Sequence, residues 1–209
     1  MTIANDAHLI TSIEHLESIY EQAVPASLAK ETAELTEHYR ALIAASPFVV
    51  LATSGPEGLD CSPRGDPKGF VRVADSRTLM IPDRRGNNRI DSLRNIVRDP
   101  RVALLFLIPG KGETFRVNGR AHLNADPALC ESFAMQGKPP KCVIVITIET
   151  SYFQCQKAIA RSKLWDPSQH AAPGALPTAG TIIAGMTNGE IGGPAYDAAY
   201  PERMKQTMY

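Results

Sequence analysis

The stretch RTLMIPDRRGNNRIDSLRNIVRDPRVALLFLIPG, residues 77–110, changes its hydrophobic period twice, and these changes indicate the fold. Its beginning, TLMIPD, is short and apolar and is bounded by polar residues, which predicts a strand. Residues 88–98 then place apolar side chains at helical spacing, and the dipeptide Asp99-Pro100 ends this helix. The remainder, RVALLFLIPG, predicts a buried strand that ends in a turn. A strand, a short helix and a second strand therefore follow one another directly.

Further strands are predicted on both sides of this stretch, separated by turn sequences such as GPEG. A second short helix is expected around residues 127–136. This order, rich in strands with two inserted helices, favours a mainly β, α+β protein built on a small antiparallel barrel over a doubly wound parallel sheet. The additional strands are FVVLATS (48–54), LDCSPRG (59–65), GFVRVAD (69–75), ETFRVNGRAHL (113–123) and KCVIVITIETSYF (141–153).

The chain divides into three parts by pattern. Residues 1–46 form a helical segment, in which Thr11 and Glu14 have the spacing of a capping box and Pro25 begins a second helix that continues towards Ser46. Residues 47–166 carry the barrel strands. Residues 167–209 are rich in Pro, Gly and Ala, and we expect this extension to pack on the barrel or on a partner subunit.

Composition excludes several classes of function. Lys+Arg and Asp+Glu both number 22 in the 209 residues, so no overall field attracts nucleic acid or an anionic membrane. Because the N-terminal region is acidic and has no cationic start before an apolar block, we do not expect it to be a secretory signal, and the apolar runs are too short to span a bilayer. The four cysteines form no CxxC pair and the histidines have no metal spacing, so no metal site is expected. We expect a cytoplasmic protein.

The segment DRRGNNR (83–89) has the residue types of an anion site. Gly86 permits an unusual backbone, Asn87 or Asn88 could cap the helix that follows, and freed N–H groups at a helix start bind phosphate. Arg89 has the wrong charge for this end of the helix dipole, so it requires a compensating anion. A solvated turn with Arg84 in water explains the same residues, and from this segment alone both interpretations stay open.

Two other segments could contribute to a binding site. In SPRGD, Ser62, Arg64 and Asp66 occupy alternate positions, so in a strand they face the same side and could form a ligand-binding wall. An edge strand defended by charges is the alternative. In RSKLW, Trp165 lies close to Arg161 and Ser162, so the ring could stack on a planar anionic cofactor or could simply anchor the tail.

Taken in order, these blocks resemble the FMN-binding split-barrel family typified by pyridoxamine 5'-phosphate oxidase. DPRVALLF resembles the strand that follows the short helix in that family, and NGRA resembles the returning strand. SPRGD, IPDRRGNNR, RVNGRA and RSKLW together are similar to a subgroup known only for its FMN dependence. The resemblance covers residues 47–166.

The resemblance implies a six-stranded antiparallel split barrel that binds FMN as a homodimer, with the flavin at the subunit interface. On this basis Ser62, Arg64 and Asp66 would line the flavin site, and the backbone of Ile81, Pro82 and Asp83 would touch the ring edge. The phosphate would be bound by Asn87, Asn88 and Arg89, and Arg161, Ser162 and Trp165 would complete the site from the other chain.

The resemblance further implies an FMN-dependent oxidoreductase that transfers a hydride or electrons through the flavin. The oxidase's Lys after its phosphate-turn Arg has no counterpart, because Ile90 stands there, and its C-terminal Trp-Gly and Arg-Leu-His blocks are missing. Pyridoxamine phosphate is therefore not the expected substrate, whereas FMN remains the expected bound cofactor, and a small molecule or NAD(P)H would react with it. A flavin carrier or sensor without turnover, and a relative that uses deazaflavin or haem, remain alternatives; haem would need an axial His such as His122.

Overall fold

The structure is a computed structural model that describes residues 8–209. Residues up to Glu31 form one compact unit and Thr32–Tyr209 form another. Residues 1–7 of the predicted N-terminal helical segment lie outside the described residues. Between residues 8 and 209, every helix is too short or too polar to cross a lipid bilayer.

The first unit contains two short helices, α1 (Ile13–Ile19) and α2 (Pro25–Ala29). Ser12, not the predicted Thr11, caps α1, because Ser12 has an extended backbone directly before the helix and its Oγ accepts the His15 N–H at 3.1 Å. Pro25 occupies the first turn of α2, as predicted. Neither helix contains a buried residue.

The prediction of one continuous helix from Pro25 to Ser46 is wrong. The helical residues are interrupted between α2 and α3 (Glu37–Ala45), where Thr32 pairs with Ser151. The Thr32 N–H donates to the Ser151 carbonyl at 3.0 Å and its carbonyl accepts the Ser151 N–H at 2.7 Å. These bonds use the backbone groups that a continuous helix would need.

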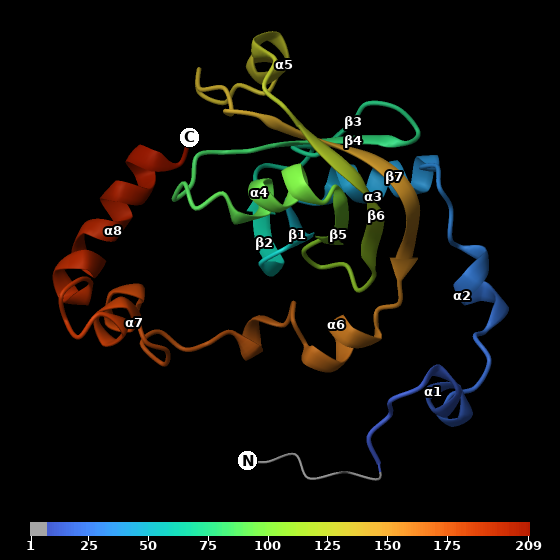
Figure 1. Ribbon diagram of the computed structural model, residues 1–209. Helices are drawn as coiled ribbons and strands as arrows, with labels where there is room; N and C mark the ends of the chain where they lie inside the picture. Colours follow the sequence, from blue (N-terminus) through green and yellow to red (C-terminus); the bar gives the residue numbers. More distant parts are fainter. Residues whose placement is uncertain (1–7) are drawn as a thin grey trace. The chain divides into compact units, whose positions relative to one another are not determined.

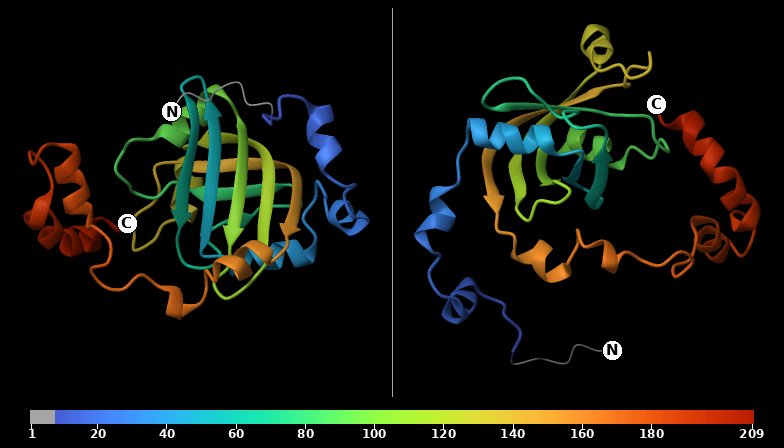
Figure 2. Two further views of the ribbon diagram at one scale, coloured as in Figure 1. Left: turned by 90° about the horizontal axis from the view of Figure 1, so that it is seen from below. Right: turned by 180° about the vertical axis from the view of Figure 1, so that it is seen from behind.

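The second unit contains a seven-stranded antiparallel sheet in the order β2-β1-β5-β6-β7-β4-β3 (Figures 1 and 2). Six strands have five or more residues and the seventh, β3, has two, so the predicted six-stranded antiparallel barrel is confirmed with a short additional edge strand. The predicted strand GFVRVAD is reduced to β3. The strands are β1 (Phe48–Gly55), β2 (Gly58–Gly65), β3 (Arg72–Val73), β4 (Thr78–Pro82), β5 (Arg101–Leu107), β6 (Thr114–Asn124) and β7 (Val143–Gln154).

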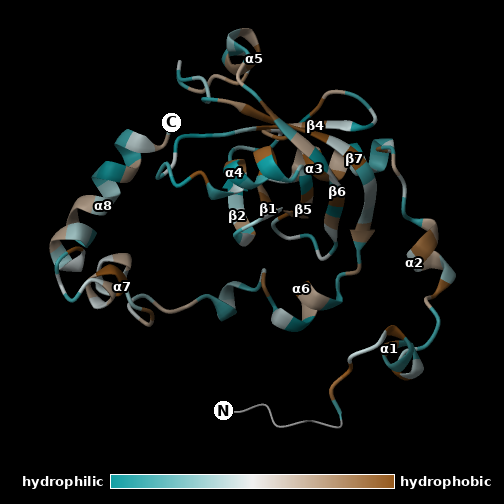
Figure 3. Ribbon diagram, viewed as in Figure 1, coloured by the Kyte–Doolittle hydropathy of each residue, from teal (hydrophilic) through white to brown (hydrophobic). Residues whose placement is uncertain are grey.

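Alternating side chains of these strands fill the core. Val49 and Leu51 of β1 are fully buried, as are Phe106 and Phe115 on β5 and β6. The Tyr39 ring of α3 lies 4.8 Å from the Phe115 ring, which packs α3 against the sheet. Figure 3 shows the hydrophobic segments of the strands, and similar segments in α2 and α7 that bury little.

Two helices are inserted between strands where the sequence predicted them. They are α4 (Asp91–Arg98) before β5 and α5 (Pro127–Ser132) before β7. After β7 the chain forms α6 (Lys157–Ser162), the 3-10 helix η1 (Pro167–Gln169), α7 (Ala179–Met186) and α8 (Gly193–Thr207).

The β6–β7 pair contains a bulge at Gly119 that is too tight for a larger residue. A Cβ at this position would lie 2.2 Å from the Thr147 carbonyl oxygen, so the backbone of β7 would have to move. We therefore expect Gly119→Ala to lower the free energy of unfolding by about 2 kcal/mol in urea titrations.

Gly185→Ala in α7 is the matched control, because no atom lies within 4 Å of the added methyl group. It should leave stability unchanged or raise it slightly, since Ala favours helix more than Gly does. Equal stability of Gly119→Ala and the native protein would contradict the close approach at the bulge.

Candidate functional site

Two ion pairs connect the edges of the sheet where the barrel is split. Strands β2 and β4 are not neighbours in the sheet order, yet the residues at their ends meet. Arg64 Nη1 lies 2.5 Å from Asp83 Oδ1, and Arg84 Nε lies 2.6 Å from Asp66 Oδ2. We call these four residues the closure cluster. Side chains, rather than main-chain hydrogen bonds, therefore close the barrel here.

The closure cluster is largely removed from solvent. The Asp66 side chain is 2% exposed and the other three are 16–18% exposed. Buried charges are tolerated only when further hydrogen bonds satisfy them. Arg84 Nη1 donates to the Phe133 carbonyl at 2.6 Å, and the Tyr209 hydroxyl donates to Asp66 Oδ1 at 2.8 Å. The Asp66–Arg84 half of the cluster is thus well satisfied.

The Arg64 half has an unused donor. Arg64 Nε is buried and has no hydrogen-bond partner within the described part of the chain. A buried N–H without an acceptor is costly, and such groups are rare in folded proteins. An acceptor supplied by a ligand would remove this cost, so Arg64 points to a binding site at the split.

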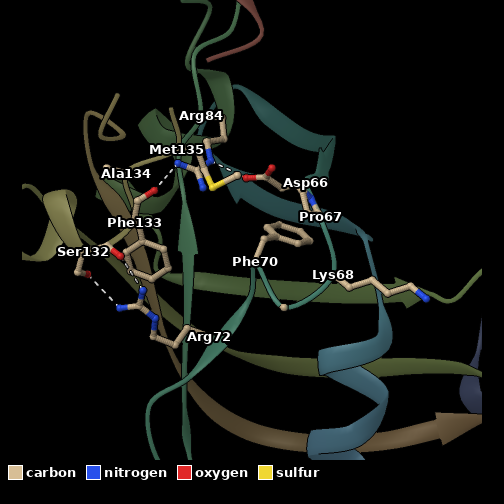
Figure 4. Close-up of a pocket in the computed structure, with 11 residues that line it drawn as sticks. Asp66, Pro67, Lys68, Phe70, Arg72, Arg84, Ser132, Phe133, Ala134 and Met135 are labelled. Atoms are coloured by element: carbon tan, nitrogen blue, oxygen red, sulfur yellow. Dashed lines mark hydrogen bonds and ion pairs between the residues drawn. The ribbon is translucent and has the colours of Figure 1, made fainter. Parts of the chain in front are cut away.

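A cavity of about 200 Å³ adjoins the closure cluster (Figure 4). Asp66 and Arg84 lie at one end, and the rings of Phe70 and Phe133 face the space between the β2–β3 connection and the segment after α5. Arg72 lies 3.7 Å over the Phe133 ring. The cavity thus combines flat apolar walls with cationic groups. Its other lining residues are Pro67, Lys68, Gly69, Ser132, Ala134 and Met135.

The predicted alternation along β2 is observed. Ser62, Arg64 and Asp66 are partly buried on the face that carries the Val49 and Leu51 side chains of β1, whereas the residues between them are exposed. Asp60 continues this face and accepts a hydrogen bond from Ser92 Oγ at 2.5 Å. This bond connects β2 with α4, and no sequence motif indicates it.

The three residues predicted at the end of β4 behave differently from one another. The Ile81 side chain is fully buried in the core, so only its backbone is available to a ligand. Pro82 is also buried, at the last position of the strand. Asp83 enters the closure cluster, and its N–H donates to the Cys142 carbonyl at 3.0 Å.

The suggestion that Asn87 or Asn88 caps the following helix is wrong. Ile90 precedes α4 in a left-handed conformation, with φ 55°, and no side chain caps the helix. Asn87 Oδ1 instead accepts the Arg89 N–H at 3.0 Å, because the loop turns before the helix begins. The first N–H groups of α4 are consequently left without a side-chain acceptor.

The compensating anion that Arg89 requires is supplied by the chain. Arg89 Nε lies 2.8 Å from Asp91 Oδ2 in the first turn of α4, and the Arg89 side chain is 74% exposed. An exposed pair of this kind contributes little to stability. Lys141 Nζ lies 3.5 Å from Asn88 Oδ1, which adds a second cation beside the loop.

Arg161, Ser162 and Trp165 do not join the other predicted residues within one chain. Strand β7 begins opposite Pro82 and runs twelve residues to Gln154, roughly 40 Å, before α6 starts. Trp165 Nε1 donates to the Lys111 carbonyl at 2.8 Å, and Ser162 Oγ donates to the Ile159 carbonyl at 3.1 Å. In the chain itself Trp165 anchors the tail to the β5–β6 turn.

Two further residues at the site carry no sequence motif, and only their positions in space identify them. Phe133 lines the cavity, and Tyr209, which is not a lining residue, donates a hydrogen bond to Asp66 of the closure cluster. Arg84 was as consistent with a solvated turn as with an anion site, but it is only partly exposed and is paired with the buried Asp66 carboxylate. The basic composition of DRRGNNR was the signal available for Arg84.

Among the described residues, the Cys142 thiol beside the site is not activated and no metal cluster is present. Burial, with a smaller effect of the Asp83 charge, raises the pKa of the Cys142 thiol to about 11, so this thiol is neutral at ordinary pH. In residues 8–209 no three His, Cys, Asp or Glu side chains are grouped to hold a metal. His122, the candidate haem ligand, is exposed on β6. The arrangement therefore suits binding and orienting a ligand.

One known protein family matches more than half of the chain. The family model for pyridoxamine 5'-phosphate oxidase matches residues 35–155. Comparison with curated proteins gives no match.

Three similar solved structures span little more than half of the chain. HupZ from Group A Streptococcus is 19% identical, with a TM-score of 0.45, over 55% of this chain and 90% of that one. An F420 reductase is 19% identical, with a TM-score of 0.43, over 57% and 98%. A Clostridium acetobutylicum protein related to general stress protein 26, of the pyridoxinephosphate oxidase family, is 15% identical, with a TM-score of 0.44, over 56% and 86%.

Two arginines of one loop allow the closure cluster to be tested. Arg84→Met removes one member of a buried pair and leaves the Asp66 charge uncompensated, so we expect a loss of about 3 kcal/mol in the free energy of unfolding. Arg89→Met breaks an exposed pair with Asp91 and should cost less than about 0.5 kcal/mol. Urea unfolding measures both. Similar losses in the two variants would mean that the cluster does not hold the barrel closed.

Proposed function

Because the chain belongs to the pyridoxamine 5'-phosphate oxidase family, we propose that it is an FMN-dependent oxidoreductase that acts on a small molecule. The observation that carries this proposal is the buried Arg64 Nε, which lacks an acceptor among the described residues. Around it the described residues offer hydrogen-bond donors and charges, and the neighbouring Cys142 thiol is not activated. Such a site suits a reaction that a cofactor performs.

The residues at the split fit the ring of a flavin. The pyrimidine edge of isoalloxazine carries carbonyl and ring-nitrogen acceptors, and Arg64 Nε supplies a donor that the protein does not use. The Asp83 carboxylate pairs with Nη1 of Arg64 and so fixes the orientation of the guanidinium. The unpaired Nε–H of Arg64 is therefore held in a fixed direction. Ser62 lies two positions before Arg64 on the same face of β2, so its hydroxyl is a second polar group on this face.

The loop before α4 fits the phosphate of FMN. The uncapped N–H groups at the start of α4 are donors, and Arg89 can exchange its weak, exposed pair with Asp91 for a phosphate oxygen. Asn88 and the neighbouring Lys141 add polar and cationic groups on the same side of the loop. FMN would therefore extend from the closure cluster to residues 87–89.

Bound FMN would supply hydride or electron transfer, and the protein would control its surroundings. The cationic Arg64 would favour extra negative charge on the pyrimidine edge. Phe70 and Phe133 would offer flat apolar surfaces to a second molecule in the cavity and exclude water from it. Asp66 is held by Arg84, so its carboxylate acts in positioning rather than as a free base.

We further propose that two copies of the chain form a dimer. Antiparallel sheets with one solvated face usually alternate apolar and polar residues. On β1 and β5, however, both faces are apolar, and the outward residues Val50, Ala52, Ala103 and Leu105 remain partly exposed. A partner subunit would cover this face. In such a dimer Arg161, Ser162 and Trp165 of the second chain would approach the flavin.

FMN binding tests the cofactor and its residues. We expect the purified protein to take up FMN, and Arg64→Met and Arg89→Ala each to raise the Kd for FMN at least tenfold in fluorescence titrations, because each removes a donor. Arg101→Met is the matched control. Arg101 is also exposed and paired with a nearby acid, Asp99, but it lies on β5, so the Kd should change less than twofold.

The oxidoreductase proposal also requires turnover. The flavin absorbance should bleach when NADH or NADPH is added without oxygen and return in air. A protein that does not take up FMN would refute the cofactor assignment. Uptake without reduction by any donor would favour a flavin carrier or sensor instead.

The dimer is tested by mass. The chain has a mass of 22.7 kDa, and light scattering should give twice this value for the native protein. Leu105→Glu places a charge on the apolar outer face and should yield monomers. Val97→Glu on α4 adds the same charge at a site that is 75% exposed, and it should leave the dimer intact. A native monomer would contradict the proposal.

A further inference from the structure

The extension after the barrel contains a compact pair of helices, α7 and α8. Asp197 of α8 joins them: its Oδ1 accepts the Gly180 N–H at 2.8 Å, and its Oδ2 accepts the Thr178 hydroxyl at 2.5 Å. The helices approach so closely that a Cβ at Gly180 would lie 2.4 Å from the Gly193 carbonyl. The two helices therefore pack directly against each other before the residues that follow α8.

The residue that this pair brings back to the barrel is Tyr209. Its hydroxyl donates to Asp66 Oδ1 at 2.8 Å, and its main-chain oxygen accepts a hydrogen bond from Lys138 Nζ at 2.9 Å. The Arg84 guanidinium lies 5.7 Å from the centre of the Tyr209 ring. Figure 1 shows this end of the chain beside the segment that follows β4.

These contacts bridge the two walls of the cavity. Asp66 belongs to the β2–β3 connection on one side, and Lys138 pairs with Met135 in the segment after α5 on the other. Asp66, Arg84 and Met135 all line the cavity. Tyr209 does not itself line the cavity, but its hydrogen bonds connect the segments on the two sides of it.

We propose that Tyr209 controls access to the cavity, acting as a latch on Asp66 that holds the end of α8 across its mouth. The inference that Tyr209 is a latch rests on its contacts with the barrel and does not require the proposed function. Its role in admitting a substrate rests on the proposed function, because only then does the cavity lie beside a flavin. A ligand that enters must displace the phenol or pass beneath it, so Tyr209 also limits ligand size.

The contacts suit a latch that opens and closes. Within the described chain, α8 contributes no buried residue, and two hydrogen bonds and one ring contact hold Tyr209 to the barrel. So few contacts allow local opening without unfolding of the sheet. The pKa of the Tyr209 phenol lies above its ordinary value, chiefly because of the hydrogen bond to Asp66, so the hydroxyl stays protonated and remains a donor.

Chemical labelling inside the cavity tests the latch without flavin. Ala134→Cys introduces a thiol on the cavity wall, and its reaction with N-ethylmaleimide can be followed by peptide mass spectrometry. We expect Tyr209→Phe in this background to speed labelling at least threefold, because only the hydroxyl of the latch is removed. Tyr200→Phe is the matched control: it removes a hydroxyl from α8 itself, where Tyr200 stacks on Tyr196, and should leave the rate unchanged.

Hydrogen–deuterium exchange provides a second measurement that needs no introduced cysteine. Tyr209→Phe should speed exchange of residues 203–209 at least fivefold, whereas Tyr200→Phe should not. Unchanged exchange in Tyr209→Phe would refute the latch. Faster exchange with an unchanged labelling rate would show that the released segment does not cover the cavity, which would also overturn the proposal.

The outcomes also separate this inference from the proposed function. Both measurements use the full chain without FMN, so a protein that fails to bind FMN can still show the latch. If FMN binds and is reduced but Tyr209→Phe alters neither rate, the latch is wrong and the proposed function stands.

Discussion

The structure depends on the pairing of charges across the split of the barrel. An antiparallel sheet that does not close by main-chain hydrogen bonds has two edge strands. Their unpaired N–H and C=O groups can bind water or pair with another chain. Here Arg64 reaches Asp83 and Arg84 reaches Asp66 from opposite edges. Side chains can separate and exchange partners more easily than a main-chain ladder can. A barrel closed in this way therefore has a place where a ligand can take part in the closure.

The same pairing explains why the candidate site combines satisfied and unsatisfied groups. Asp66 accepts a further hydrogen bond from Tyr209 and Arg84 donates one to the Phe133 carbonyl, so this pair has additional partners. Arg64 pairs with Asp83 through Nη1, and its buried Nε–H has no acceptor among the described residues. Burying a cation is costly unless its donors are used. The fold accepts that cost at Arg64, which is the kind of local exception expected at a binding site.

Some features of the site could be predicted because they follow from local periodicity. The alternation in SPRGD places Ser62, Arg64 and Asp66 on one face of β2, and the structure has this arrangement. Whether Asn87 or Asn88 caps α4 could not be predicted, since it depended on whether the loop turned before the helix, and neither residue caps it. Ile90 adopts a left-handed conformation, which sequence rules disfavour for a β-branched residue, and this shifts the start of α4.

The sequence by itself determined the succession of strands and helices, the antiparallel barrel and the basic composition of the segments near its split. Hydrophobic periodicity and turn residues are local patterns that extend over a few positions, so a short segment of sequence is enough to predict a strand, a helix or a turn. Only the tertiary structure decided the partners of Arg64, Asp66 and Arg84, and the return of Tyr209 to Asp66 from 143 residues away. These partners are selected by sheet register and barrel closure, which bring distant residues together through packing that no local pattern encodes.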